Sequence, residues 1–116
     1  MKYLRQGAVG VDQGVTSLFS HYESDGEMWT GTGEREVRQT INFTSPFLEP
    51  PAVHLSIALF DLDQETNGRA DLAAEKVTET GFEAVFRTWS DTRVARIRVS
   101  WLAVGPVSFE DDWDVE

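Results

Sequence analysis

The chain has 116 residues, 41% of them hydrophobic and 11% aromatic, with a formal net charge of −10 at pH 7. This length and composition suit one domain with a packed core and exclude a disordered chain. Twenty acidic residues against ten basic ones argue against a nucleic-acid partner, which requires a basic surface. The lack of cysteine excludes disulfides and thiolate metal sites.

Targeting signals are not evident in the sequence. The first residues form no apolar signal segment, and no stretch is long and apolar enough to span a bilayer. We therefore expect no membrane insertion. The cytoplasm, export by a non-classical route and the surface of a particle all stay open as locations.

The first third of the chain is predicted to hold an arm, a strand and a loop. Gly7, Gly10 and the following Gly14 indicate an irregular arm over residues 1–13, which leads into a first strand near residues 15–19. A turn is expected at residues 24–26. Residues 28–34 contain a tryptophan and two glycines and are predicted to form an exposed loop. No strand precedes this loop and no helix follows it, so it is not a phosphate-binding loop.

Three further strands are predicted in the middle of the chain. Residues 37–43 alternate between apolar and polar, and three prolines in residues 46–51 end that strand. Residues 52–62 are the most apolar strand, with an outer face that is itself partly apolar. Such a face indicates that something covers it, for example another copy of the chain. Residues 69–77 form the fourth strand. The side of 52–62 predicted to face the core consists of Val53, Leu55, Ile57 and Leu59.

Residues 81–105 are predicted to form a hairpin around which the domain is organised. Alternation places Phe82, Ala84 and Phe86 inward in its first strand. A polar turn at residues 90–92 follows. In the second strand the inward residues are predicted to be Ala95, Ile97, Val99, Trp101 and Ala103.

Trp89 is out of phase with the inward residues of its strand, because the inward position there is Thr88. We therefore expect its indole to point away from the core, beside a loop. Two interpretations stay open, a ring half-buried under a loop or a subunit contact, and a ring offered to a ligand.

No helical periodicity is present, and six short strands separated by turn residues predict an antiparallel sandwich or barrel. Catalytic chemistry is not expected. The two histidines, His21 and His54, have no nucleophile at a supporting spacing, and no carboxylate lies in an apolar stretch. Asp61, Asp63 and Glu65 alternate as in a calcium loop, but the required glycine and distal glutamate are absent. We expect no metal, no other cofactor and no enzyme activity.

A binding module with outward aromatic and guanidinium groups near turns fits this pattern. That combination suits sugars, because a ring stacks on the C–H face of a pyranose and Arg donates to hydroxyls. Each shallow site is weak, since hydroxyls lose water when they bind. Repeated copies raise avidity by ~10²–10⁴ where the geometry permits.

An ordered set of motifs between residues 35 and 104 resembles the H-type lectin domain, the family of snail agglutinins and the C-terminal domain of discoidins. The overall style, with an arm of the form Gly-Val-Asp-Gln-Gly at residues 10–14 and no signal peptide, looks bacterial. The matching pieces are residues 41–47 (INFTSPF), 50–53 (PPAV), 55–57 (LSI), 61–63 (DLD), 67–69 (NGR), 77–78 (VT), 81–82 (GF), 88–89 (TW), 91–92 (DT) and 100–103 (SWLA).

The resemblance implies a six-stranded antiparallel β-sandwich that assembles as a homotrimer, or as a hexamer made of two trimers. It implies a metal-free site at each subunit interface for glycans of the galactose or N-acetylgalactosamine type, as in cell adhesion. The outer face of residues 52–62 would line the trimer axis. The domain would comprise residues 1–34 as arm, first strand and loop, residues 35–105 as the lectin-like core, and residues 106–116 as an acidic tail.

The resemblance also assigns site residues. The family's arginine falls on Arg69 and its tryptophan on Trp89. Ser90 stands where the snail proteins have histidine, which removes one ring-nitrogen hydrogen bond. From the loop before the second strand, Gly31 and Glu34 correspond to the family's glycine and aspartate, although the aspartate itself is absent.

Two other functions stay open. One is a structural trimerisation or appendage module whose sugar site has decayed, which Ser90 and the missing aspartate favour. The other is a monomeric sandwich that holds a protein partner through residues 109–116.

Overall fold

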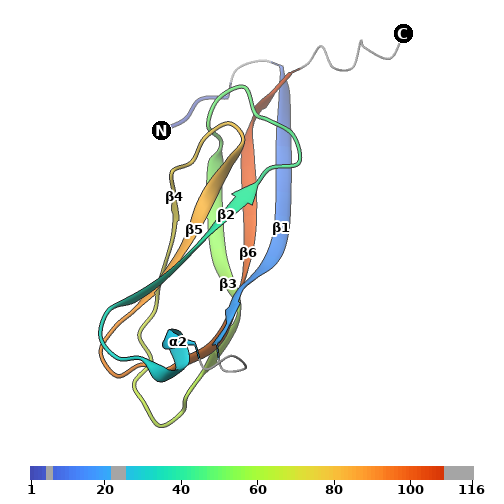
Figure 1. Cartoon of the computed structure of the whole chain (residues 1–116). Coiled ribbons are helices and arrows are strands. Elements are labelled where there is room, and N and C mark those ends of the chain that lie inside the picture. The colour runs from blue at the N-terminus through green and yellow to red at the C-terminus, as the bar shows by residue number, and fades with distance from the viewer. Residues whose placement is uncertain (5–6, 22–25, 109–116) are drawn as a thin grey trace.

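The computed structural model describes residues 1–4, 7–21 and 26–108, and its strands form two facing three-stranded antiparallel sheets (Figure 1). The predicted six-stranded antiparallel β-sandwich is confirmed. The elements are β1 (Ala8–Ser20), α2 (Glu27–Thr30), β2 (Arg35–Asn42), β3 (Ala52–Leu62), β4 (Asp71–Glu75), β5 (Gly81–Thr88) and β6 (Val94–Val107).

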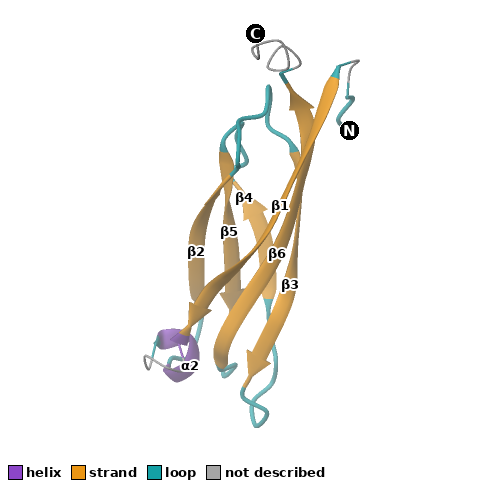
Figure 2. Cartoon of the chain, turned by 90° about the vertical axis from the view of Figure 1, so that its right-hand side faces the viewer, coloured by secondary structure: helices purple, strands orange, loops and turns teal. Residues whose placement is uncertain are grey.

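The strand order is β1-β6-β3 in one sheet and β2-β5-β4 in the other. The short helix α2 lies at one end of the sandwich, together with the β3–β4 loop and the β5–β6 turn (Figure 2). In the part of the chain that the structure describes, no helix has the length and apolar character needed to cross a membrane.

The core lies between the two sheets. Phe82 packs its ring 5.9 Å from Phe43 and 5.8 Å from Trp101, and Phe19 lies 5.6 Å from Phe86, measured between ring centroids. These contacts join the sheets because Phe82 and Phe86 lie on β5, whereas Trp101 lies on β6 and Phe19 on β1. The alternation predicted for β5 and β6 is confirmed, since most inward side chains there are fully buried. The buried cluster comprises Leu18, Phe19, Met28, Ile41, Phe43, Phe47, Phe82, Ala84, Phe86, Val94, Ile97, Val99 and Ala103.

The predicted hairpin over residues 81–105 is wrong. Its two strands exist, but β5 pairs with β2 and β4, whereas β6 pairs with β1 and β3. The turn between them carries the chain from one sheet to the other. Alternation identifies which side of a strand faces the core but not which strand is its neighbour, so the prediction assigned the wrong partner.

The first strand is longer than predicted, because the residues expected to form an irregular arm pair with β6 from Ala8 onward. Gly10 and Gly14 occupy inward positions of β1. A Cβ on Gly14 would lie 2.8 Å from the indole nitrogen of Trp101, and one on Gly10 would collide with Val107. These glycines give room to large side chains of the neighbouring strand, which is why the segment lacks the apolar alternation of a strand.

The bounds predicted for β3 are confirmed, but the predicted inward position of Leu59 is wrong. A register shift between Ile57 and Leu59 pairs Leu59 with the outward Arg98 and Phe60 with the inward Ile97. The Phe60 ring then reaches Phe86, 6.5 Å away in a T-shaped arrangement. A β-bulge of this kind exchanges the two faces of a strand beyond it.

The loop over residues 28–34 is not wholly exposed. Its start forms α2, and Met28 is fully buried in the core. The main-chain amide of Met28 donates to Nδ1 of His21, 3.2 Å away. A four-residue helix is too short to show helical periodicity, which explains why it was not predicted. The turn expected at residues 24–26 lies largely outside the described residues, as does the tail from residue 109.

Candidate functional site

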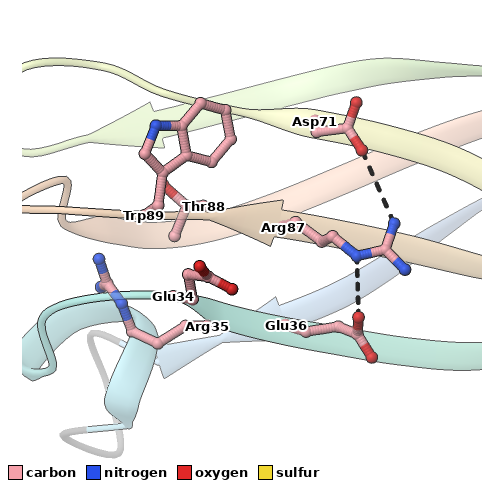
Figure 3. A pocket seen from close by; sticks show the side chains of 7 residues that line it. All are labelled: Glu34, Arg35, Glu36, Asp71, Arg87, Thr88 and Trp89. Carbon is pink, nitrogen blue, oxygen red and sulfur yellow. Dashed lines mark hydrogen bonds and ion pairs between the residues drawn. The ribbon is translucent and has the colours of Figure 1, made fainter.

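A cavity of about 690 Å³ lies at the α2 end of the β2-β5-β4 sheet (Figure 3). Three segments form it, namely the start of β2, the end of β5 and the start of β4. Its volume falls within the ~300–1,000 Å³ typical of small-molecule sites. The lining residues are Glu34, Arg35, Glu36, Asp71, Arg87, Thr88 and Trp89.

Trp89 contributes the aromatic surface of this cavity. Its side chain is 42% exposed, whereas the preceding Thr88 is 1% exposed. The hydroxyl of Thr88 donates to the carbonyl of Arg69 at 2.6 Å, which fixes the end of β5 against the segment before β4. The prediction that Thr88 takes the inward position and Trp89 points away from the core is confirmed.

The turn after Trp89 is held in an unusual conformation. Ser90 has φ of 64°, a left-handed backbone that side-chain-bearing residues seldom adopt. Its carbonyl accepts the main-chain amide of Gly33 at 2.9 Å, and the hydroxyl of Thr92 donates to the carbonyl of Asn67 at 2.5 Å. The turn that presents Trp89 is therefore held from two sides, by the loop before β2 and by the loop before β4.

The side chain of Arg35 connects these loops. Arg35 was not among the site residues predicted from the sequence. The side chain is 6% exposed overall, and Nε donates to the carbonyl of Gly33 at 2.9 Å, while Nη2 donates to that of Ser90 at 3.1 Å. Nη1 lies 3.4 Å from the carbonyls of Glu27 and Met28. Burial lowers the pKa of the Arg35 guanidinium from its ordinary value, and the nearby charge of Glu27 opposes this effect. One cation thus satisfies carbonyls of α2, the following loop and the β5–β6 turn.

A signal for Arg35 was present in the sequence. It continues the inward phase of β2 that includes Val37 and Ile41, and an arginine in that phase requires buried acceptors. The strand was predicted to begin at residue 37, two positions too late, so the phase was not extended to Arg35.

Gly31 shapes the loop but does not line the cavity. Its amide donates to the carbonyl of Glu27 at 2.8 Å, closing α2. A Cβ at this position would lie 2.6 Å from the same carbonyl oxygen and 3.1 Å from Cδ of Arg35. The main chain approaches so closely there that a side chain would displace either α2 or Arg35.

Arg69 also lies beside the cavity rather than in its lining. Its Nη1 donates to Oδ1 of Asp91 at 2.6 Å and to the hydroxyl of Thr92 at 3.1 Å. The hydrogen bond from Arg69 lowers the pKa of the Asp91 carboxyl from its ordinary value. Arg69 therefore braces the turn that follows Trp89.

The five predicted site residues lie at the same end of the molecule but differ in position. Trp89 and Glu34 line the cavity, whereas Gly31, Arg69 and Ser90 belong to the surrounding loops. Glu34 is exposed, and its carboxylate has no hydrogen bond or ion pair to any other described residue.

A network of ion pairs continues from the cavity across the outer face of the sheet. Arg87 contacts Glu36 at 2.9 Å, Glu75 at 3.0 Å and Asp71 at 3.7 Å. Arg38 on β2 reaches Glu75 on β4 at 3.0 Å. These pairs cross above β5, where the outward-facing Val85 is fully buried. The network therefore covers apolar surface that alternation had predicted to be exposed.

Among residues 1–4, 7–21 and 26–108, no group of three or more His, Cys, Asp or Glu side chains is placed to hold a metal ion. The alternating acids at the end of β3 and just after it have other contacts. Asp61 pairs with Arg96 at 3.0 Å, and Asp63 accepts the main-chain amide of Glu65. The exposed indole, the free carboxylate and the hydrogen-bonded loops form a site suited to binding rather than to covalent chemistry.

Comparison with known proteins identifies relatives of this chain. A protein from the bacterium Fuscovulum blasticum, described as "ATP synthase subunits region ORF 7", is 49% identical over 114 residues, which cover 97% of this chain and 99% of that protein. One of the discoidin-1 polypeptides of Dictyostelium discoideum is 33% identical over 75 residues, 64% of this chain and 30% of the discoidin. The present chain thus spans less than half the length of the discoidins.

The fold has a counterpart among solved structures. Recombinant discoidin II of Dictyostelium discoideum superposes on 90% of this chain with a TM-score of 0.75 and 24% identity, and the match covers 39% of the discoidin chain. The family model described as "H-type lectin domain" matches residues 38–104, which include β3, β4, β5 and most of β2 and β6. The chain belongs to the H-type lectin domain family.

Proposed function

We propose that the protein is a lectin that binds glycans of the galactose or N-acetylgalactosamine type in the cavity beside Trp89. The observation that carries this proposal is the half-exposed indole inside a cavity of ligand size, in a chain of a lectin-domain family. A flat apolar ring next to hydrogen-bonding groups is the surface that a pyranose requires.

Each residue of the site has a distinct role in this proposal. Trp89 packs against the C–H face of the sugar. The carboxylate of Glu34 accepts hydroxyl protons, because it has no partner among the described residues. Arg69, Ser90 and Gly31 hold the two loops at the distance that the ring needs. The binding requires no metal and involves no catalysis.

We further propose that the chain assembles as a homotrimer or hexamer. In support, the outer face of the β1-β6-β3 sheet exposes apolar side chains, with Val11 at 64%, Val15 at 63% and Leu102 at 38%. A cluster of exposed apolar residues on one face favours a protein–protein contact. Several copies of a weak site then act together, which raises avidity.

A structural assembly module with a decayed sugar site is the second candidate. The pairing of Arg69 with Asp91 and Thr92 favours it, because these bonds occupy donors that the family arginine would offer to a ligand. Ser90 in place of histidine favours it as well. In this alternative the apolar sheet face is functional and the cavity is not.

One experiment separates the two. Isothermal titration with N-acetylgalactosamine and galactose should give saturable binding for the wild type and none for Trp89→Ala. Tyr3→Ala, which removes another exposed aromatic side chain far from the cavity, should bind as the wild type does. Light scattering should report the same assembly for all three proteins. Unchanged binding by Trp89→Ala would reject the assigned site, and an assembly with no sugar binding at millimolar concentrations would favour the structural module.

A further inference from the structure

Among the charged groups that line the cavity beside Trp89, acidic side chains outnumber basic ones by three to two. Three of its lining residues are carboxylates, Glu34, Glu36 and Asp71, and two are cations, Arg35 and Arg87. Figure 3 shows the Glu34 carboxylate in the space between Trp89 and Arg87. The charge that a ligand meets depends on which of these groups are already paired.

Both cations are engaged by the protein itself. The guanidinium of Arg35 donates to main-chain carbonyls, and Figure 3 shows it directed away from Arg87 and Glu36. Arg87 is surrounded by carboxylates, with Glu36 at 2.9 Å and Asp71 at 3.7 Å. An incoming anion would therefore have to displace an existing ion pair to reach either cation.

Glu34 differs from these two arginines. It has no ion pair or hydrogen bond to the described residues, and it lines a cavity that also holds an exposed indole. The net charge of −10 adds a negative field over the whole surface. A positive group on a ligand would gain the Glu34 carboxylate and the face of Trp89 without breaking a bond within the protein.

We propose that this site selects saccharides by charge, taking hexosamines with a free ammonium group in preference to their N-acetylated forms and rejecting sulfated or carboxylated sugars. This inference rests on the proposed lectin function. The sugar ring packs on Trp89, and the ammonium group pairs with Glu34. Sulfate or carboxylate on the same ring meets three carboxylates and no unpaired cation.

Three matched ligands test the proposal, namely galactosamine, N-acetylgalactosamine and N-acetylgalactosamine 6-sulfate. The titrations are made at about pH 6, where the sugar amine is charged. Titration calorimetry on the full chain should show galactosamine binding about three- to tenfold more tightly than N-acetylgalactosamine, the range expected for an exposed charge-assisted hydrogen bond. The sulfated sugar should bind most weakly. Raising the salt concentration should reduce the preference.

Glu34→Gln is the decisive variant, because it keeps the shape and hydrogen-bonding capacity of the side chain and removes its charge. It should bind galactosamine and N-acetylgalactosamine equally well. Glu49→Gln removes an exposed carboxylate far from the cavity and should keep the wild-type preference.

The outcomes distinguish this inference from the function on which it rests. If N-acetylgalactosamine binds and Trp89→Ala abolishes the binding, but galactosamine gains nothing or its advantage survives in Glu34→Gln, charge selection is wrong and the lectin function stands. Tighter binding of the sulfated sugar would overturn charge selection as well. If none of the three sugars binds, the lectin function itself is overturned.

Discussion

At the scale of single residues, the site depends on a few side chains that hold main-chain segments rather than on those that face the ligand. Arg35 is the clearest example. Its three nitrogens reach carbonyls of α2, of the loop before β2 and of the turn after Trp89. The helix α2 and the loop that follows it thus share one buried cation with the turn at Ser90, which is 55 residues from Arg35, and the position of Trp89 depends on this cation.

Arg35→Met tests this role. The substitution keeps an apolar stem of similar reach but leaves several carbonyls without a donor, so we expect the free energy of unfolding to fall by about 1–3 kcal/mol. Urea denaturation measures that loss. Hydrogen exchange should also accelerate at the Gly33 amide, whose acceptor is the Ser90 carbonyl. Protection at Gly33 equal to that of the wild type would show that Arg35 does not hold the loops together.

At the scale of elements, the outer face of the β2-β5-β4 sheet is stabilised by charge. Hydrogen bonds from Arg38 hold the pKa of Glu36 below its ordinary value of 4.5. The pKa of Glu75 is also lowered from 4.5, mainly by its hydrogen bond from Arg87 and secondly by that from Arg38. A carboxyl whose pKa is lower in the folded state than in the unfolded state stabilises the fold while it is ionised. Each exposed pair contributes little alone, but these share their arginines and act as a network.

The network predicts a specific pH dependence. Its contribution is fully present above the ordinary pKa of 4.5 and is lost as the pH falls through the lower pKa values of the folded state. The free energy of unfolding, measured by denaturation at a series of pH values, should therefore decrease below that point, and less steeply in Glu75→Gln. High salt should weaken the effect. Glu49→Gln is the control, and an acid sensitivity in Glu75→Gln equal to that of the wild type would contradict the account.

The sequence predicted single elements better than their partners. The bounds of β3 and the inward sets of β5 and β6 were correct because apolar and polar residues alternate there with a period of two. The predicted pairing of β5 with β6 was wrong, because turn residues between two strands do not indicate whether those strands belong to the same sheet. The start of β1 was missed because Gly10 and Gly14 give space to neighbouring side chains instead of supplying apolar ones.

At the site, the residues that line the cavity and were named beforehand, Trp89 and Glu34, were easier to predict than those that position them. The outward phase of Trp89 follows from alternation alone, and Glu34 came from the family resemblance. Arg69 was expected at the ligand, but its contact with Asp91 depends on how two distant turns meet. Arg35 was missed because its strand was predicted to begin at residue 37, so the inward phase was not extended to it.

At the scale of the whole molecule, the features that support the proposed function lie on two separate surfaces. These are the α2 end of the sandwich and the outer face of the β1-β6-β3 sheet. The cavity lies at the α2 end of the β2-β5-β4 sheet, next to the β5–β6 turn through which the chain passes to the other sheet. The exposed apolar side chains lie on the outer face of the β1-β6-β3 sheet. This separation lets several copies associate through one surface while their cavities stay accessible, which suits a multivalent binder.

The central claim is that a sugar binds against the indole of Trp89. The chain has four tryptophans, and each indole N–H gives a separate signal in a ¹H–¹⁵N correlation spectrum, assigned with single Trp→Phe variants. On titration with galactosamine and N-acetylgalactosamine, the Trp89 signal should shift progressively to saturation, while the signal of Trp101, which packs against Phe43 and Phe82 in the core, stays in place. Saturating shifts confined to other tryptophans, or no shift at millimolar sugar, would contradict the account.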